Sequence, residues 1–124
     1  MRIAIVDDCE NERNELCKRL SQSSFSRSYD IEICGYGNGT DFLNEAMQNR
    51  FDLVFMDIYM SGMNGTDTAS LMRRSDNRVI LIFLTSSPDH MKDAFNVHAF
   101  HYIEKPISRE RMYCCLDDAF RLIP

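Results

Sequence analysis

Short apolar runs alternate along the chain with longer segments in which apolar residues recur every three or four positions. Runs rich in β-branched and aromatic residues predict strands, and apolar residues at helical spacing predict helices with one buried face. The expected strands occupy residues 2–6, 29–35, 51–56, 79–84 and 99–103. The expected helices occupy residues 9–20, 40–49, 66–74, 88–96 and 108–122, so that a helix follows each strand. Thr40 is expected to cap the second helix and Pro88 to open the fourth.

Five strand-helix units in 124 residues predict one α/β domain that spans residues 1–124. Right-handed crossovers between parallel strands would place helices on both faces of a doubly wound sheet. The run 79–84 is nearly all apolar, which is typical of a strand that helices cover on both faces. The segment 29–35 alternates polar and apolar residues, which indicates an edge strand with one wetter face.

Polar residues that suit phosphoryl chemistry follow these apolar runs. They are Asp7 and Asp8 after the first run, Asp57 after the third, Thr85 after the fourth and Lys105 after the fifth. We expect them to converge, because ligands in doubly wound folds bind where the carboxyl ends of the strands meet. Close carboxylates repel by about 4 kcal/mol per pair at an effective dielectric of about 20. A divalent cation would relieve that repulsion, and oxygen ligands favour a hard ion such as Mg2+ or Mn2+.

Such a site would support nucleophilic attack on phosphorus. The Asp57 carboxylate would form an aspartyl phosphate, while Lys105 and Thr85 hold phosphoryl oxygens. Each residue also has an ordinary explanation: the acidic pair as a helix cap, Asp57 as a turn residue and Lys105 as a solvated charge. Their joint occurrence at correctly ordered strand ends favours the phosphoryl site.

The composition limits the partners, metal sites and cellular locations that we expect for this chain. A formal net charge of -5 argues against this chain alone binding a nucleic-acid backbone. The five cysteines form no CxxC pair, so neither a zinc site nor a disulfide framework is expected. We interpret the adjacent Cys114 and Cys115 as packing residues, with a redox pair as the alternative. No apolar stretch approaches the roughly 20 residues that span a bilayer, so we expect a soluble, cytoplasmic protein with no membrane contact.

Five segments together form a specific set of motifs: Ile3–Asp8, Asp52–Asp57, Met60–Gly65, Leu84–Ser86 and Tyr102–Pro106. On these segments the chain resembles a bacterial response-regulator receiver domain over essentially its whole length. The resemblance implies a flavodoxin-like fold with strand order 2-1-3-4-5 and five helices, and a signalling function in a two-component system. The family pattern has proline after the matching methionine, where this chain has Ser61, so the loop is expected to be less rigid.

The resemblance also implies a role for each site residue. Asp57 would accept phosphate from a sensor histidine kinase. The ligands of Mg2+ or Mn2+ would be Asp7, Asp8, Asp57 and the backbone carbonyl of Tyr59. Thr85 and Lys105 would bind the phosphoryl group. The domain would assist its own phosphorylation and dephosphorylation and would not be an enzyme in the usual sense.

Thr85 and Tyr102 match the family's switch pair, in which the hydroxyl moves toward the phosphate and the aromatic ring turns inward. Phosphorylation would shift the population between two packings of the fourth helix, fifth strand and fifth helix. The apolar residues expected on this face are Met91, Phe95, Val97, Phe100 and Tyr102. They suggest a homodimer, and core packing is the alternative explanation for some of them.

The output of the switch has three interpretations. Residues 98–106 resemble receivers attached to LytTR-type DNA-binding domains, which implies transcription regulation through a separate domain. A stand-alone receiver that docks a protein or relays phosphate is the alternative. A magnesium-dependent phosphatase of the haloacid-dehalogenase type is disfavoured. Such enzymes place the nucleophile on the first strand and need a second Asp where this chain has Tyr59.

Tyr59 and Ser87 lie two residues after Asp57 and Thr85, respectively. They are expected to flank the path of a hydrolytic water to the acyl phosphate. We expect the Tyr59 ring to shield the phosphate partly and to lengthen its lifetime.

Overall fold

Five parallel strands form the centre of the structure, a computed structural model that describes residues 1–23 and 25–123. The strands are β1 (Arg2–Val6), β2 (Glu32–Tyr36), β3 (Leu53–Asp57), β4 (Ile80–Thr85) and β5 (His101–Glu104). They are ordered β2-β1-β3-β4-β5, and every neighbouring pair is parallel. The predicted doubly wound sheet and its order are confirmed. The predicted domain 1–124 includes Ser24 and Pro124, which lie outside the described residues.

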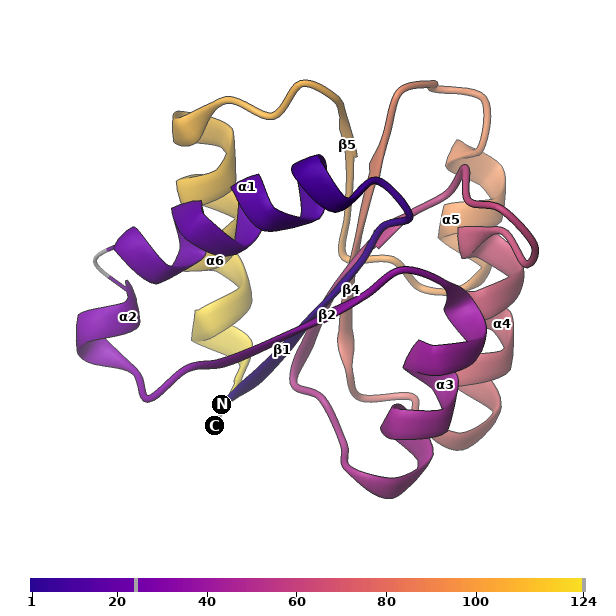
Figure 1. The fold of residues 1–124 in the computed structure, drawn as a ribbon, viewed down its shortest axis with the longest axis horizontal. Helices are drawn as coiled ribbons and strands as arrows, with labels where there is room; N and C mark the ends of the chain where they lie inside the picture. The colour runs from indigo at the N-terminus through magenta and orange to yellow at the C-terminus, as the bar shows by residue number, and fades with distance from the viewer. Residues whose placement is uncertain (24, 124) are drawn as a thin grey trace.

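Helices cover both faces of this sheet (Figure 1). They are α1 (Glu10–Gln22), α2 (Phe25–Ser28), α3 (Gly39–Gln48), α4 (Gly65–Ser75), α5 (Met91–Asn96) and α6 (Arg109–Leu122). In Figure 1, α1 and α6 lie on one face, and α3, α4 and α5 lie on the other. The five predicted helices are all present. The four-residue α2 is an addition that is too short to show a periodic apolar stripe.

Two apolar cores result from this layering, one on each face of the sheet. Successive strand residues point to opposite faces, so Val54 packs in one core with Phe42 while Phe55 packs in the other with Leu16 and Leu116. β3 is buried throughout and β4 is buried except at its first residue, whereas β2 at the edge is exposed or half-buried. The predictions of a fully covered fourth strand and of an edge strand are thus confirmed.

A local side-chain bond sets the start of α3. The prediction that Thr40 caps this helix is wrong, because the side chain of Asn38 accepts the backbone N–H of Asp41 at 2.8 Å. The helix therefore begins at Gly39. A Cβ atom at that position would lie 2.1 Å from Oγ1 of Thr68, so glycine permits the close approach of α3 to α4.

Two further boundaries differ from the periodic pattern. α5 begins at Met91 rather than at Pro88, because a turn precedes it in which the Asp89 N–H donates to Ser87 Oγ at 3.1 Å. β2 begins only at Glu32, where its pairing with β1 starts. Within the described part of the chain, each helix falls short of the length and apolarity that crossing a bilayer requires.

Candidate functional site

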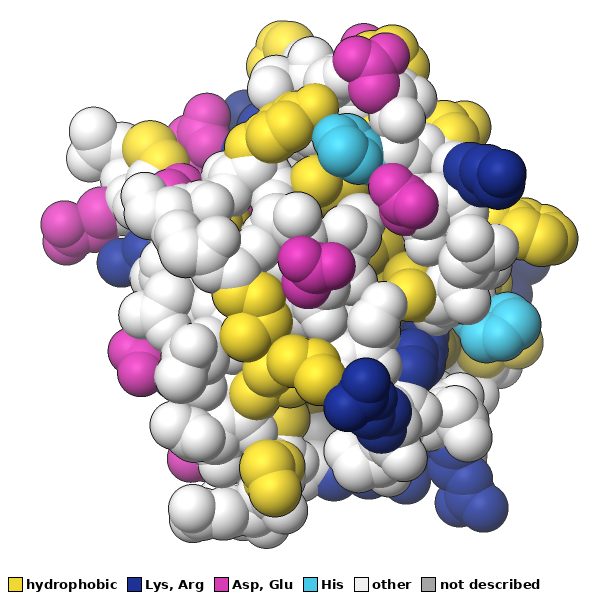
Figure 2. Space-filling model, turned by 90° about the vertical axis from the view of Figure 1, so that its right-hand side faces the viewer, with side chains coloured by type: hydrophobic (Ala, Val, Ile, Leu, Met, Phe, Trp, Pro, Cys, Tyr) yellow, Lys and Arg dark blue, Asp and Glu magenta, His cyan; other side chains and the backbone are white. Residues whose placement is uncertain are grey.

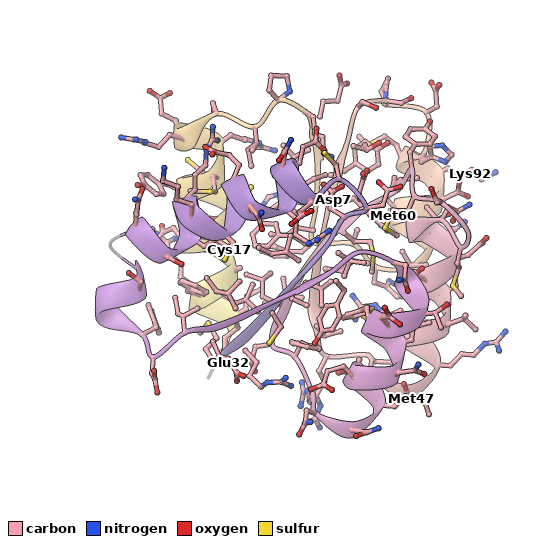
Figure 3. The ribbon with its side chains drawn as sticks, viewed as in Figure 1. Asp7, Cys17, Glu32, Met47, Met60 and Lys92 are labelled. Atoms are coloured by element: carbon pink, nitrogen blue, oxygen red, sulfur yellow. The ribbon has the colours of Figure 1, made fainter. Side chains whose placement is uncertain are left out.

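The carboxyl ends of the strands bring polar side chains to one edge of the sheet. Asp7 directly follows β1, Asp57 and Thr85 end β3 and β4, and Lys105 directly follows β5. Figure 3 shows Asp7 at this edge, on the same side as Met60 in the loop after β3. Because β1 lies beside β3, the strand order itself places the first acidic residue next to Asp57.

A lysine ammonium joins the carboxylates. Nζ of Lys105 lies 3.0 Å from Oδ2 of Asp7 and 3.4 Å from Oδ2 of Asp57. Asp7 is 6% exposed, Asp57 is 7% exposed and the Lys105 side chain is 18% exposed, so these charges are largely removed from water. Burial alone would lower the pKa of Lys105, but hydrogen bonds to Glu12 and Asp7 outweigh burial and raise that pKa.

The surroundings of Asp57 make its ionised form costly. The pKa of Asp57 is raised from 3.8 to about 6, because burial, together with the like charge of Asp7, outweighs the opposing charge of Lys105. The carboxyl group is therefore mostly ionised at neutral pH, but in an unfavourable environment. A carboxylate held in this way gains more than an exposed one from a nearby cation or from bonding to an electrophile.

Glu12 is a site residue that the sequence pattern missed. Its Oε2 lies 2.5 Å from Nζ of Lys105. Among the described residues, carboxylate oxygens of Asp7, Glu12 and Asp57 lie within 4.8 Å of one another and could share an ion. Such an all-oxygen donor set fits Mg2+ or Mn2+. The available signal was its place in the first turn of α1, the helix that begins three residues after Asp7.

Asp8 is not one of the carboxylates in this group and is bonded to the loop after β3 instead. Its Oδ2 accepts the backbone N–H of Ser61 at 2.9 Å and lies 3.4 Å from the Ser61 hydroxyl. Proline at position 61 would lack that N–H. Ser61, where the family pattern has proline, thus adds a hydrogen bond between the segments that follow β1 and β3. This bond restrains the loop that was expected to be less rigid.

Gly65 allows the loop after β3 to turn back onto the strand. A Cβ atom there would lie 2.0 Å from the backbone oxygen of Asp57 and 2.8 Å from Cα of Ile58. The N–H of Gly65 donates to the Ile58 carbonyl at 2.8 Å. The first residue of α4 therefore packs directly against the backbone that carries the Asp57 side chain.

The Tyr59 side chain is half exposed, and its hydroxyl group is hydrogen-bonded. Its hydroxyl lies 2.9 Å from Nε2 of His90, and the two rings meet edge to face with centroids 5.2 Å apart. Nδ1 of His90 lies 3.3 Å from Oδ2 of Asp93. A neutral ring with its proton on Nδ1 satisfies both contacts, because Nε2 then accepts the tyrosine hydroxyl. These contacts hold the side chain of Tyr59 against His90, the N-cap residue of α5.

The pair Thr85 and Tyr102 sits on neighbouring strands. Thr85 is fully buried, and its Oγ1 accepts the Ser87 N–H at 3.4 Å. The Tyr102 ring is half-buried against Phe83, with centroids 6.4 Å apart. Its hydroxyl donates to the Ser87 carbonyl at 2.5 Å and accepts the His90 N–H at 3.3 Å. The ring is thus turned inward, onto the loop that follows Thr85.

Only part of the expected apolar patch is available to a partner. Phe95 is 81% exposed and Met91 is 57% exposed, both on α5. Val97 is buried in the core under that helix, and Phe100 packs against the core on the opposite face. Figure 2 looks onto the side formed by α3, α4 and α5, where hydrophobic side chains alternate with charged ones. The exposed part of the expected apolar patch therefore consists of Met91 and Phe95 on α5, with the partly exposed Tyr102 beside them.

The cysteines are free thiols. Cys115 is buried in the core beneath α6, where burial raises the pKa of its thiol, while Cys114 is exposed. The two adjacent residues thus differ in environment. This supports packing as the role of Cys115.

Known proteins match this chain across the site. Residues 3–117 match the model of the response regulator receiver domain family. The sensory transduction protein LytT of Bacillus cereus is 34% identical over 113 residues, which are 90% of this chain and 44% of LytT. The transcriptional regulatory protein YpdB of Escherichia coli is 30% identical over 116 residues, with the same two coverages of 90% and 44%. This chain spans less than half the length of these relatives.

A solved structure gives the same result for the fold. The response regulator TrrA of Thermotoga maritima, in complex with Mg2+ and beryllium fluoride, superposes with a TM-score of 0.82 at 26% identity. The superposition covers 95% of this chain and 97% of TrrA.

Proposed function

The chain belongs to the response regulator receiver domain family, and from this premise we propose that it is a phosphorylation-controlled switch driven by a histidine kinase. The observation that carries the proposal is the Lys105 ammonium, 3.0 Å from Asp7 and 3.4 Å from Asp57. This group lies where ligands bind in doubly wound sheets. The domain assists its own phosphorylation and dephosphorylation and does not turn over a separate substrate.

The carboxylates at this edge would hold Mg2+ or Mn2+. The proposed ligands are Asp7, Asp8, Asp57 and the backbone carbonyl of Tyr59, an all-oxygen set that suits a hard divalent ion. Asp8 would have to leave Ser61 to join them. When bound, the ion supplies positive charge that offsets the charge of the phosphoryl oxygens. The complex of TrrA with Mg2+ and beryllium fluoride supports this assignment.

Asp57 is the proposed nucleophile. One of its carboxylate oxygens attacks the phosphorus of a phosphohistidine, and the P–O bond forms as the P–N bond breaks. The histidine of the kinase leaves with the electron pair of that bond and takes up a proton. Lys105 holds one phosphoryl oxygen by charge, and the Thr85 hydroxyl donates to another. Hydrolysis later returns the free carboxylate and inorganic phosphate.

Tyr59 and Ser87 are proposed to control the approach of the hydrolytic water. The Tyr59 ring is fixed by its bond to His90 at 2.9 Å, beside the end of β3. The Ser87 N–H donates to the buried Thr85 hydroxyl, and the Ser87 carbonyl accepts the Tyr102 hydroxyl. A ring fixed in this position excludes water from part of the acyl phosphate, which lengthens its lifetime.

The readout is proposed to run through Thr85 and Tyr102. A bond from the Thr85 hydroxyl to the phosphoryl group would weaken its bond to the Ser87 N–H, and the loop before α5 would repack. Because Tyr102 bonds that loop twice, the change reaches the surface of α5, β5 and α6. The added charge thus shifts a population between two packings.

Two outputs are compatible with this surface. Relatives named as sensory transduction and transcriptional regulatory proteins favour transcription regulation through a separate DNA-binding domain of the LytTR type. Homodimerisation through Met91 and Phe95 is the proposed link to that output. A stand-alone receiver that docks a protein or relays phosphate is the alternative. A phosphatase is disfavoured, because Asp57 ends β3 and Tyr59 occupies the position of the second acid.

Intact-protein mass spectrometry tests the proposal. The protein is incubated with Mg2+ and acetyl phosphate, which transfers its phosphoryl group and releases acetate. We expect a gain of about 80 Da on the parent that hydroxylamine removes, and no gain on Asp57→Asn. An equal adduct on both proteins, or no adduct on the parent with either acetyl phosphate or a phosphorylated kinase, would refute the assignment of Asp57.

A further inference from the structure

The three donors of the Lys105 ammonium are all in use. A lysine side chain has three N–H donors and no acceptor. Nζ of Lys105 bonds Glu12 at 2.5 Å, Asp7 at 3.0 Å and Asp57 at 3.4 Å. A phosphoryl oxygen can be bound by this ammonium only if one of these carboxylates gives up its place.

Glu12 is the partner that can leave. The side chains of Asp7 and Asp57 are 8% and 9% exposed, and both residues are fixed at strand ends. The Glu12 side chain is 51% exposed and stands in the first turn of α1, so water can replace its bond to lysine. Leaving a buried carboxylate without its cation costs far more than releasing an exposed one.

We infer that Glu12 is a positioning residue that occupies Lys105 in the unphosphorylated protein and must be displaced when a phosphoryl group arrives. This inference rests on the proposed function of Asp57. The Glu12 carboxylate lies within 4.8 Å of the carboxylate oxygens of both Asp7 and Asp57. It therefore also repels the anionic donor at the point of attack. The bond to Lys105 holds Glu12 at this position, so both the occupied ammonium and the repulsion depend on that bond.

The reaction that reports this role is phosphorylation by acetyl phosphate at saturating Mg2+. An Asp57 oxygen forms the P–O bond, the bond from phosphorus to the acetyl oxygen breaks, and acetate leaves with the electron pair. Glu12→Gln keeps the length of the side chain but removes its charge. We expect this variant to react about two- to fivefold faster, as suits the loss of a partly exposed ion pair.

Glu10→Gln is the matched control. Glu10 is exposed in the same first turn of α1, so both variants lose the same charge from the same helix end. Any general effect on net charge or on the helix dipole is therefore common to both. We expect the rate of Glu10→Gln to stay within about 1.5-fold of the parent at an ionic strength of about 0.15 M, where exposed charges are screened.

A second pair of variants tests whether Glu12 acts through the lysine. In a Lys105→Ala background the ammonium is gone, so Glu12→Gln should change the remaining rate by no more than Glu10→Gln does. A gain from Glu12→Gln that persists in this background would overturn the inference. So would equal rates for the Glu12 and Glu10 variants, or a slower Glu12→Gln protein. If the parent itself takes up no phosphate on Asp57, the proposed function fails instead.

Discussion

Replacing Asp57 by asparagine is expected to stabilise the protein at neutral pH. The substitution keeps the shape of the side chain and removes a charge that the fold holds in a buried site, 7% exposed and beside Asp7. The amide can still accept a hydrogen bond from Lys105, which also keeps its bonds to Asp7 and Glu12. Asp57, the proposed nucleophile, would thus lower the free energy of unfolding of the parent protein.

The size of the effect follows from the raised pKa of Asp57. Folding moves this pKa from 3.8 to about 6, mainly by burial. A carboxyl group whose pKa is raised contributes stability below its unfolded pKa and loses that contribution as the pH rises through the folded pKa. This change in the pKa corresponds to about 3 kcal/mol. We therefore expect Asp57→Asn to gain about 1–3 kcal/mol above pH 7 and little near pH 4, where the parent carboxyl is already largely neutral.

Urea unfolding at a series of pH values checks this expectation. The chain has no tryptophan, so far-ultraviolet circular dichroism is the suitable signal. Asp30→Asn, at an exposed residue, serves as the control and should show no such pH-dependent gain. Mg2+ should narrow the difference between parent and Asp57→Asn, because it stabilises the folded protein that binds it better. An Asp57→Asn protein that is less stable at pH 8, or a difference that is the same at pH 4 and pH 8, would refute the reasoning.

Three other substitutions test the loops and the α5 surface. Gly65→Ala should lower the free energy of unfolding by about 2–4 kcal/mol in thermal or urea unfolding, because its Cβ would lie 2.0 Å from the carbonyl oxygen at the end of β3. Gly37→Ala is the control and should leave the free energy of unfolding nearly unchanged, because its Cβ would lie 3.6 Å from the nearest atom. Tyr59→Asn should speed loss of the phosphoryl group about threefold or more, a barrier change of about 0.7 kcal/mol, and an unchanged half-life would contradict the shielding role. Phe95→Ser should weaken any phosphorylation-dependent self-association about tenfold in sedimentation equilibrium. Met47→Ser, at a residue on α3 that is 78% exposed, should leave it unchanged, and equal effects of the two variants would contradict a dimer through α5.

The sheet could be predicted from the sequence because its signals are local and strong. Each strand is a short apolar run, and the fully covered β4 is apolar over nearly its whole length. Helix starts were less predictable, because side-chain bonds decide them. Asn38 rather than Thr40 caps α3, and the bond of Asp89 to Ser87 delays α5.

The site was predictable where its residues end buried strands. Asp7, Asp57 and Lys105 converge as their positions in the chain predict, because the strand order places them at one edge. No comparable pattern in the sequence predicts which way an exposed side chain points. Asp8 is bonded to Ser61 outside the group, while Glu12 reaches into it from α1.

The charges at this edge explain why an exposed acid belongs there. Asp7, Glu12 and Asp57 bring three negative charges, and Lys105 brings one positive charge. In the proposed cycle Asp8 brings a further negative charge, a divalent ion offsets two of the remaining three, and the phosphoryl group carries about -1.5 to -2 in place of the single charge of the Asp57 carboxylate. If every carboxylate were buried, the site would have no group able to yield its place at the ammonium. Because Glu12 can move into water, a phosphoryl oxygen replaces one negative partner of Lys105 instead of adding a fourth, which limits the electrostatic cost of phosphorylation.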